Sequence, residues 1–315
     1  MSTSDALSQI LRGVRFSGAL QFCIAPSGPW RIDAGASMRK LGLVPGRFVP
    51  FHVIAKGSCW LVTGTRRDTL QAGDVVAFPF ASQHELGSGE GGRLLDPATT
   101  LPPKPWASVP VLRSGDGGEE ARILCGYVEC AALTFGPFSA CLPEVLMARS
   151  GDGRDTWLAA TVLQIEREVE AGGAGSSSML ERLTETMFIQ VLRQHIEVAA
   201  EAREGWLAAC ADPQVGRAIA GIHKDPQRDW TLEALAQVSG ASRSVLVERF
   251  QRHLGVSPMR YVRDWRLHRA SLSLAETNAS VAEIAAEAGY ASEAAFTRAF
   301  ARTYGAPPAA WRKAR

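Results

Sequence analysis

The first 145 residues carry short apolar runs separated by clusters of glycine, proline and aspartate. The runs are ALQFCI, RFVPFHVIA, SCWLVTG, DVVAFPF and RILCGYVEC, and each has the length of a single strand. Short strands with turn residues between them are typical of an antiparallel barrel or sandwich. The stretch GSGEGGRLLDPATTLPPKPWASVP lacks such a run and predicts a long irregular loop.

The pattern becomes helical at about Asp152. Two amphipathic segments, DTWLAATVLQIEREVEAG and MLERLTETMFIQVLRQHIEVAAEAREGW, flank the flexible sequence AGGAGSSS. They predict an αα-hairpin that packs on the barrel or on a second subunit. The remaining sequence predicts short helices. We therefore expect an α+β multidomain protein with a β-barrel over 1–145, a helical linker or dimerisation hairpin over 146–207 and an all-α domain over 208–315.

Two stretches of the C-terminal third, 231–258 and 280–308, repeat one arrangement of residues. Each begins with a Thr or Ser N-cap and a short helix that ends at glycine, and a further Ser opens a second helix. A small alanine allows the two helices to cross closely, and a phenylalanine fills their shared core. The paired positions are Gly240 and Gly289, Ala236 and Ala285, and Phe250 and Phe300. This is the pattern of a helix-turn-helix, and 258–276 predicts one long helix between the two units.

Two helix-turn-helix units on a rigid connector can enter major-groove segments about one DNA turn apart. The charge distribution agrees with such a role. Residues 212–315 contain 15 Lys and Arg against 10 Asp and Glu, whereas the rest of the chain contains 19 against 22. A basic C-terminal third indicates a nucleic-acid partner. The alternative is a helical bundle with repeated packing and no such partner.

The overall composition, 46% hydrophobic and 21% charged, is ordinary for a globular protein. No apolar run reaches the roughly 18 residues that span a bilayer, and the N-terminus lacks the order of a signal peptide. We therefore expect a cytoplasmic protein. In a reducing compartment cysteines are more often buried thiols, metal ligands or redox sensors than structural disulfides. The six cysteines are Cys23, Cys59, Cys125, Cys130, Cys141 and Cys210.

Residues 212–312 resemble the AraC/XylS family of bacterial transcription regulators, most closely in IAAEAGYASEAAFTRAFARTYGAPPAAWR (284–312). The resemblance implies promoter binding by both recognition helices. Arg298 suits a bidentate contact with guanine or a phosphate, and Glu248 could accept a hydrogen bond from cytosine. We also expect a homodimer and contact with RNA polymerase. The groove-facing residues that the resemblance implies are Arg243, Ser244, Val247, Glu248, Glu293, Ala294, Thr297 and Arg298.

Two segments of the N-terminal part, GRFVPFHVIAKGSCWLVTG (46–64) and GDVVAFPFASQH (73–84), resemble the two motifs of the cupin barrel. His52 and His84 occupy the two positions whose side chains converge inside a cupin. Ile54 stands where metal-binding cupins place a second histidine, and the glutamate that usually follows is absent. The usual three-His, one-Glu iron site is therefore missing, which argues against an oxygenase.

Strand alternation separates the two thiols of ILCGYVEC, because Cys125 and Cys130 point to opposite faces of a regular strand. The segments FCIAPSGPW, FHVIAKG, ASQHEL and LCG resemble a cupin-containing AraC subtype that includes the reactive-chlorine-sensing regulators. This resemblance selects Cys23, His52, His84 and Cys125, and it implicates the two cysteines in oxidant sensing. Three interpretations stay open: the four residues bind zinc, the thiols are poised to form a Cys23–Cys125 disulfide, or the side chains only pack.

The function expected from these observations is transcription regulation. The cupin-like domain would sense an oxidant, a metal or a small ligand, and the helix-turn-helix pair would bind an operator. The alternative is an enzyme, either a metal-dependent cupin or a zinc-thiolate alkyl acceptor with an accessory DNA-binding domain. The incomplete first cupin motif and the lack of a four-cysteine cluster near the N-terminus argue against both. In a third interpretation an organic effector lies against Trp30, Trp60 and Phe78, and the cysteines are incidental.

Overall fold

The computed structural model describes residues 16–35, 37, 48–103, 106, 108–115, 117, 119–130, 133, 135–150, 156–201 and 205–313. The described residues form two compact units. We call them the sheet unit, which takes residues 16–130 and 142–198, and the helical unit, which takes the described residues of 131–141 and 199–315. Asp152, the expected start of the helical pattern, lies outside the described residues. None of the described helices is long and apolar enough to cross a bilayer.

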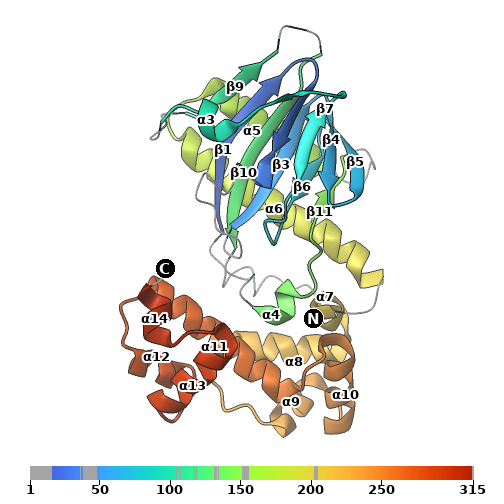
Figure 1. Cartoon of the computed structure of the whole chain (residues 1–315). Helices are drawn as coiled ribbons and strands as arrows, with labels where there is room; N and C mark the ends of the chain where they lie inside the picture. The colour runs from blue at the N-terminus through green and yellow to red at the C-terminus, as the bar shows by residue number, and fades with distance from the viewer. Residues whose placement is uncertain are drawn as a thin grey trace. The chain divides into compact units, whose positions relative to one another are not determined.

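The sheet unit is built from two sheets (Figure 1). The first has the order β11 (Leu146–Ala148), β6 (Val75–Ala77), β3 (Phe48–Lys56), β10 (Arg122–Cys130), β1 (Phe16–Pro26) and β9 (Val111–Ser114). The second has the order β5 (Arg66–Gln71), β4 (Ser58–Thr63), β7 (Glu85–Ser88), β2 (Trp30–Asp33) and β8 (Arg93–Leu94). Paired strands are antiparallel except for β1 with β9 and β2 with β8. The expected cupin-like fold is confirmed, as two sheets rather than one closed ring.

Apolar side chains from both sheets meet in one core. The first sheet supplies Phe22, Ile24, Ile54, Val76, Ile123 and Cys125, and the second supplies Trp30, Ile32, Cys59, Leu61, Leu70 and Leu86. Strand β3 is buried along most of its length, and helix α5 (Thr156–Ala171) contacts it as well. A strand that is covered on both faces reads as a continuous apolar run, which explains the sequence FVPFHVIA.

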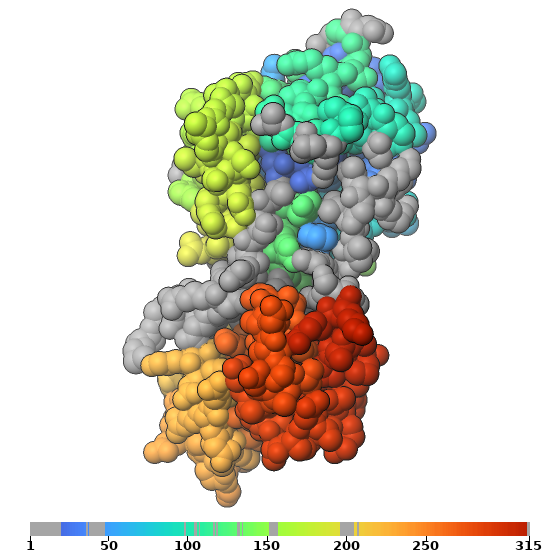
Figure 2. Space-filling view, turned by 90° about the vertical axis from the view of Figure 1, so that its left-hand side faces the viewer, coloured from blue at the N-terminus to red at the C-terminus, as the bar shows by residue number. Residues whose placement is uncertain are grey.

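The helical hairpin belongs to the sheet unit. It consists of α5 and α6 (Ser176–Glu201), and its buried side chains include Leu158, Val162 and Ile165. Arg122 of β10 pairs with Glu166 at 3.4 Å and also with Glu170, so charges as well as apolar contacts fasten α5 to the sheet. The opposite side of the hairpin lies at the molecular surface (Figure 2). A short helix, α3 (Pro97–Thr100), completes this unit.

The helical unit confirms the predicted pair of helix-turn-helix motifs. Thr231, Ser242, Ser280 and Ser292 cap the four motif helices by accepting backbone N–H groups. Phe250 and Phe300 are fully buried, as the repeat predicts. The helices are α4 (Gly136–Ser139), α7 (Gly205–Ala211), α8 (Pro213–Lys224), α9 (Leu232–Ser239), α10 (Arg243–Leu254), α11 (Pro258–Glu276), α12 (Val281–Glu287), α13 (Glu293–Tyr304) and α14 (Pro308–Lys313).

The two motifs differ in the length of their turns. Before the turn the buried positions Leu235 and Ile284 are 49 residues apart, whereas after it Leu246 and Phe296 are 50 apart. Each turn contains a glycine with a left-handed backbone, φ 66° at Gly240 and 77° at Gly289. The second turn therefore holds one more residue between its glycine and the next N-cap.

A segment that the sequence assigns to the barrel belongs to the helical unit instead. Leu133 and residues 135–141 directly follow β10, yet they cluster with the C-terminal helices. Phe135 and Phe138 are 1% exposed. The expected boundary at 145 thus does not coincide with the division of the structure, because the chain leaves the sheet unit after Cys130 and returns at Leu142.

Candidate sensor site and nucleic-acid interface

Three of the four predicted sensor residues form one hydrogen-bonded chain in the sheet unit. The register of β10 against β3 places Cys125 opposite His52. Cys125 Sγ lies 3.1 Å from His52 Nδ1, and His52 Nε2 lies 2.8 Å from His84 Nε2. His84 Nδ1 in turn lies 2.7 Å from the carbonyl oxygen of Ser82. The side chains of all three residues are buried.

Counting donors fixes the direction of every proton in this chain. The Ser82 carbonyl can only accept, so His84 carries its proton on Nδ1 and presents a bare Nε2. His52 must then donate from Nε2, which leaves its Nδ1 as an acceptor. Cys125 can therefore donate its thiol proton to His52 Nδ1 at 3.1 Å, which is much closer than its other acceptor, the Ile123 carbonyl oxygen at 4.0 Å. The arrangement holds with a neutral thiol and two neutral imidazoles.

The electrostatics agree with these neutral forms. Burial lowers the pKa of His52 well below its ordinary value, and the neighbouring His84 lowers it further. Burial likewise lowers the pKa of His84 to about 4. Burial raises the pKa of the Cys125 thiol well above its usual range, with smaller contributions from Cys23 and Cys59. A thiol in such a place loses its proton only when an adjacent base accepts it.

The turn before β7 aims His84 into the core. The ring of His84 stacks on Phe78, with centroids 3.5 Å apart and planes at 7°. Ala81, in the slot where the cupin motif usually has glycine, has φ 51°. A left-handed backbone at a residue with a Cβ costs roughly 1–2 kcal/mol. The chain accepts this strain at the turn that positions the site.

Cys23 does not join the chain. It lies opposite Leu124 in the β1–β10 register, whereas Cys125 lies opposite Phe22. The side chains of Cys23 and Cys125 therefore leave opposite faces of the sheet. Cys23 is also fully buried, and burial raises the pKa of its thiol, which the nearby Arg122 partly offsets. A Cys23–Cys125 disulfide would require one of the two strands to turn over.

The expected zinc set does not fit this arrangement. His52 uses one ring nitrogen toward Cys125 and the other toward His84, so the three side chains surround no common point. Within the described parts of the chain, no three His, Cys, Asp or Glu side chains are placed to share a metal ion. Of the other cysteines, Cys59, Cys130 and Cys210 are buried and Cys141 is half-buried.

A small cavity adjoins the thiol. It has a volume of about 30 Å³, and its walls include Phe22, Ile32, Ala34, Pro50, His52 and Cys125. Such a space holds one molecule of about the size of water. Its lining is mostly apolar, so a small uncharged molecule would enter more readily than an ion.

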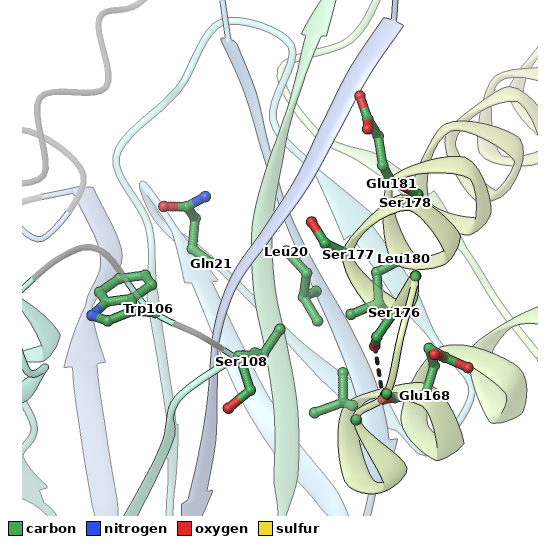
Figure 3. Close-up of a pocket in the computed structure, with 15 residues that line it drawn as sticks. Leu20, Gln21, Trp106, Ser108, Glu168, Ser176, Ser177, Ser178, Leu180 and Glu181 are labelled. Carbon is green, nitrogen blue, oxygen red and sulfur yellow. Dashed lines mark hydrogen bonds between the residues drawn. The ribbon is translucent and has the colours of Figure 1, made fainter.

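A larger cleft of about 520 Å³ lies between β1 and the turn of the hairpin (Figure 3). Trp106 stands on one side, Leu20 forms part of the floor and the Ser177 hydroxyl points inward (Figure 3). The carboxylates of Glu168 and Glu181 point apart (Figure 3). Because its polar groups do not converge, this cleft does not define the chemical class of a ligand.

The predicted DNA-reading residues lie on one side of each recognition helix. On α10 Arg243, Ser244 and Glu248 are exposed, and on α13 Glu293, Ala294 and Arg298 are exposed. Val247 and Thr297 are half-buried. The exposed charges of α10 are partly neutralised, since Arg243 pairs with Glu233 of α9 at 2.6 Å and Glu248 pairs with Arg252 of α10 itself. Arg298 has no ion pair with any of the described residues, so its guanidinium is available for a base or a phosphate.

Comparison with known proteins agrees with both parts of the molecule. A family model described as a cupin matches residues 5–197, and a helix-turn-helix model matches residues 235–314. An AraC-like transcription regulator from Streptomyces lividans is 31% identical over 325 residues, covering 98% of either chain. The RCS-specific transcriptional activator RclR of Escherichia coli is 23% identical, covering 98% of this chain and 97% of its own. The solved structure of ToxT from Vibrio cholerae is 11% identical over 96% of this chain, with a TM-score of 0.38.

These relatives are transcription regulators rather than enzymes, in agreement with the incomplete cupin metal motif. The helix-turn-helix pair supplies the DNA-binding function that their names imply. The chain belongs to the cupin-containing branch of the AraC-type family of DNA-binding transcription regulators.

Proposed function

We propose that this regulator responds to a small oxidant through Cys125. The observation that carries the proposal is the one-directional chain from the Cys125 thiol through His52 to His84, beside an apolar cavity. An imidazole nitrogen that accepts the thiol hydrogen bond is placed to take the proton as the sulfur reacts. The oxidant class is also favoured by similarity to a relative named as RCS-specific.

The chemistry needs one oxidant of the form X–OH, such as a hydroperoxide or a hypohalous acid. The sulfur of Cys125 attacks the oxygen, the X–O bond breaks, and His52 Nδ1 accepts the thiol proton and passes it to the leaving group X⁻. The products are a sulfenic acid and HX, so sulfur is oxidised and the oxidant is reduced. The added oxygen would occupy the cavity, whose volume of about 30 Å³ leaves room for little more.

In this proposal the regulator responds by binding its operator through both recognition helices. Arg243, Ser244, Val247 and Glu248 would face one major-groove segment. The equivalent residues of the second motif, Glu293, Ala294, Thr297 and Arg298, would face the next segment. Oxidation would shift the balance between conformations with different DNA affinity. Contact with RNA polymerase at the promoter belongs to the same proposal.

Binding to DNA from the gene's own upstream region, measured by fluorescence anisotropy, tests the proposal. Reduced and hypochlorite-treated protein should differ in Kd by about tenfold, which corresponds to about 1.4 kcal/mol. Cys125→Ser should abolish the difference. Cys130→Ala is the matched control, because Cys130 lies on the same strand but on the other face, and it should respond like the unmodified chain.

Replacement of His52 separates the base from the thiol. His52→Gln should slow the reaction of Cys125 with the oxidant by about a hundredfold, the lower range for loss of a general base. Mass spectrometry of the intact protein follows the added oxygen. An unchanged response of Cys125→Ser, or a zinc content near one equivalent that falls on Cys125→Ser, would contradict the metal-free mechanism.

The assembly proposed for DNA binding is a homodimer formed through the hairpin. Trp157 and Leu163 on α5 are 46% exposed, and Met179 at the start of α6 is 50% exposed. The hairpin occupies the surface of the sheet unit (Figure 2). Sedimentation analysis should show a dimer that Leu163→Glu dissociates, and a monomeric unmodified chain would refute this part of the proposal.

A further inference from the structure

The segment after β10 forms part of the core of the helical unit. We call its described residues, Leu133 and 135–141, the strap. Its Phe135 ring packs edge-on against Tyr261 and Trp265, with centroids 5.5 and 5.1 Å away, and lies 5.3 Å from His268. Its Phe138 packs edge-on against Trp206 at 5.6 Å. Such aromatic pairs stabilise a fold by more than the burial of their surface area alone would give.

The strap packs over a buried hydrogen-bond network from which water is excluded. Trp206 Nε1 donates to the Tyr261 hydroxyl at 2.7 Å, and that hydroxyl lies 2.9 Å from His223 Nε2. His223 also stacks on Trp265 at 3.7 Å, and burial lowers its pKa well below the usual range. His223 Nδ1 has no hydrogen-bond partner among the described residues. Removing Phe135 would admit water to these groups and change their preferred packing.

The residues under the strap belong to the element that connects the two DNA-reading motifs. Tyr261, Trp265 and His268 lie on α11. This helix contacts α9 and α10 of the first motif, and it also contacts α12, α13 and α14, which follow it in the chain. The position of α11 therefore influences the spacing of α10 and α13. Two recognition helices bind adjacent groove segments only when that spacing matches the DNA repeat.

We propose that the strap, when packed against α11, holds this helix in the arrangement that binds DNA. We also propose that strand β10 transmits the state of the sheet unit to the strap. β10 carries Cys125 and ends at Cys130, three positions before the first residue of the strap. The first part of this inference stands without the redox proposal. The second part rests on it, because it identifies β10 and the strap as the route by which oxidation of Cys125 reaches the helical unit.

Substitutions in the full chain test the first part. Phe135→Ala should weaken operator binding by at least about tenfold and lower the Tm of the helical unit by on the order of 10 °C, as expected for loss of a buried ring. Phe135→Leu should restore most of the affinity, since it refills the volume. Phe80→Ala is the matched control, because Phe80 is 41% exposed in the sheet unit, and it should leave DNA binding unchanged.

Unchanged operator affinity in Phe135→Ala would refute the role of the strap in DNA binding. If Phe135→Ala instead unfolds the helical unit, Phe135→Leu decides. A folded Phe135→Leu protein that binds the operator as weakly as the unfolded Phe135→Ala protein would overturn the inference that filling this volume holds α11 in its DNA-binding arrangement. Near-full affinity would support it.

An insertion tests the second part. Gly-Ser-Gly-Ser placed directly after Cys130 should leave affinity in the reduced state near that of the original chain but abolish the response to hypochlorite, because a flexible linker does not transmit strain. Mass spectrometry should still show oxidised Cys125. The same insertion after Gly64, in the exposed β4–β5 turn, should preserve the response.

A full response in the chain extended after Cys130 would overturn the route through the strap. A lack of any oxidant response in the original chain would instead overturn the redox proposal, and with it this route. The Phe135 variants would still decide the first part.

Discussion

Acidification from about pH 7.5 to about pH 5 should destabilise the sheet unit through its buried histidine pair. An unfolded chain protonates a histidine near pH 6.5, whereas in the folded protein burial lowers the pKa of His84 to about 4. The unfolded state therefore binds more protons between these two values. The stabilisation is fully present above pH 6.5 and declines as the pH falls toward 4.

The loss of unfolding free energy follows from how far the pH lies below the histidine pKa of the unfolded chain. At pH 5 the difference of about 1.5 pKa units corresponds to a loss of about 2 kcal/mol from His84. The pKa of His52 is lowered as well, by burial and by the neighbouring His84, so it adds to this loss. Together they would remove at least about 2 kcal/mol from a free energy of unfolding that is typically about 5–15 kcal/mol.

Urea unfolding at the two pH values provides the assay, with a variant that carries both His52→Gln and His84→Gln as the comparison. Its unfolding free energy should change by at least about 2 kcal/mol less between the two pH values than that of the original chain. The buried His223 and His268 of the helical unit remain in both proteins and contribute equally. Identical pH dependence in the two proteins would show that the sheet-unit histidines titrate normally, which would refute the neutral chain described above.

Three further outcomes test the helical unit. Phe300→Ala should cost about 3–5 kcal/mol of unfolding free energy because the ring is fully buried, and a cost under about 1 kcal/mol would contradict that packing. Arg298→Gln should weaken operator binding by about 1–3 kcal/mol and relax selectivity at a single base pair, measured with a set of singly substituted operators; a uniform loss over all operators would indicate a phosphate contact instead. Ser280→Ala removes a capping box and should cost about 1 kcal/mol in thermal unfolding, whereas the exposed Ser178→Ala should cost nothing measurable.

The helix-turn-helix pair was predictable because its signals are local. A serine that caps a helix, a glycine that ends one and a phenylalanine at a fixed spacing act within about a dozen residues. The repetition of Gly240, Ser242 and Phe250 at Gly289, Ser292 and Phe300 removed most of the ambiguity of a single motif. The same reasoning gives the strands of the sheet unit, although not which strands pair.

The geometry of the candidate site depends on information that the sequence lacks. Strand parity placed Cys125 and Cys130 on opposite faces from their own spacing, and the register of β10 has this form. Cys23 lies on another strand, so its face depends on pairing across about a hundred residues and on the irregularity between Leu20 and Phe22. Similarity alone grouped it with the histidines. The contact of His52 with Cys125 arises from the same long-range register.

The strap left no trace in the sequence pattern. LTFGPFSAC contains a short apolar stretch that suits a loop on the barrel equally well. Its partners, Trp206, Tyr261 and Trp265, follow it by 60 residues or more. Neither periodicity nor a local cap specifies a contact of that kind, which results only from tertiary packing.

The extra residue in the second turn makes the two helix-turn-helix motifs of one chain unequal. The two motifs differ in turn length, and α10 and α13 expose different side chains. A single chain therefore carries two different recognition helices in a fixed order. An operator bound by one chain is then asymmetric, and reversing it creates a different ligand rather than the same ligand viewed from behind. The base sequence of an operator would thus determine the orientation of a chain that binds it through both motifs.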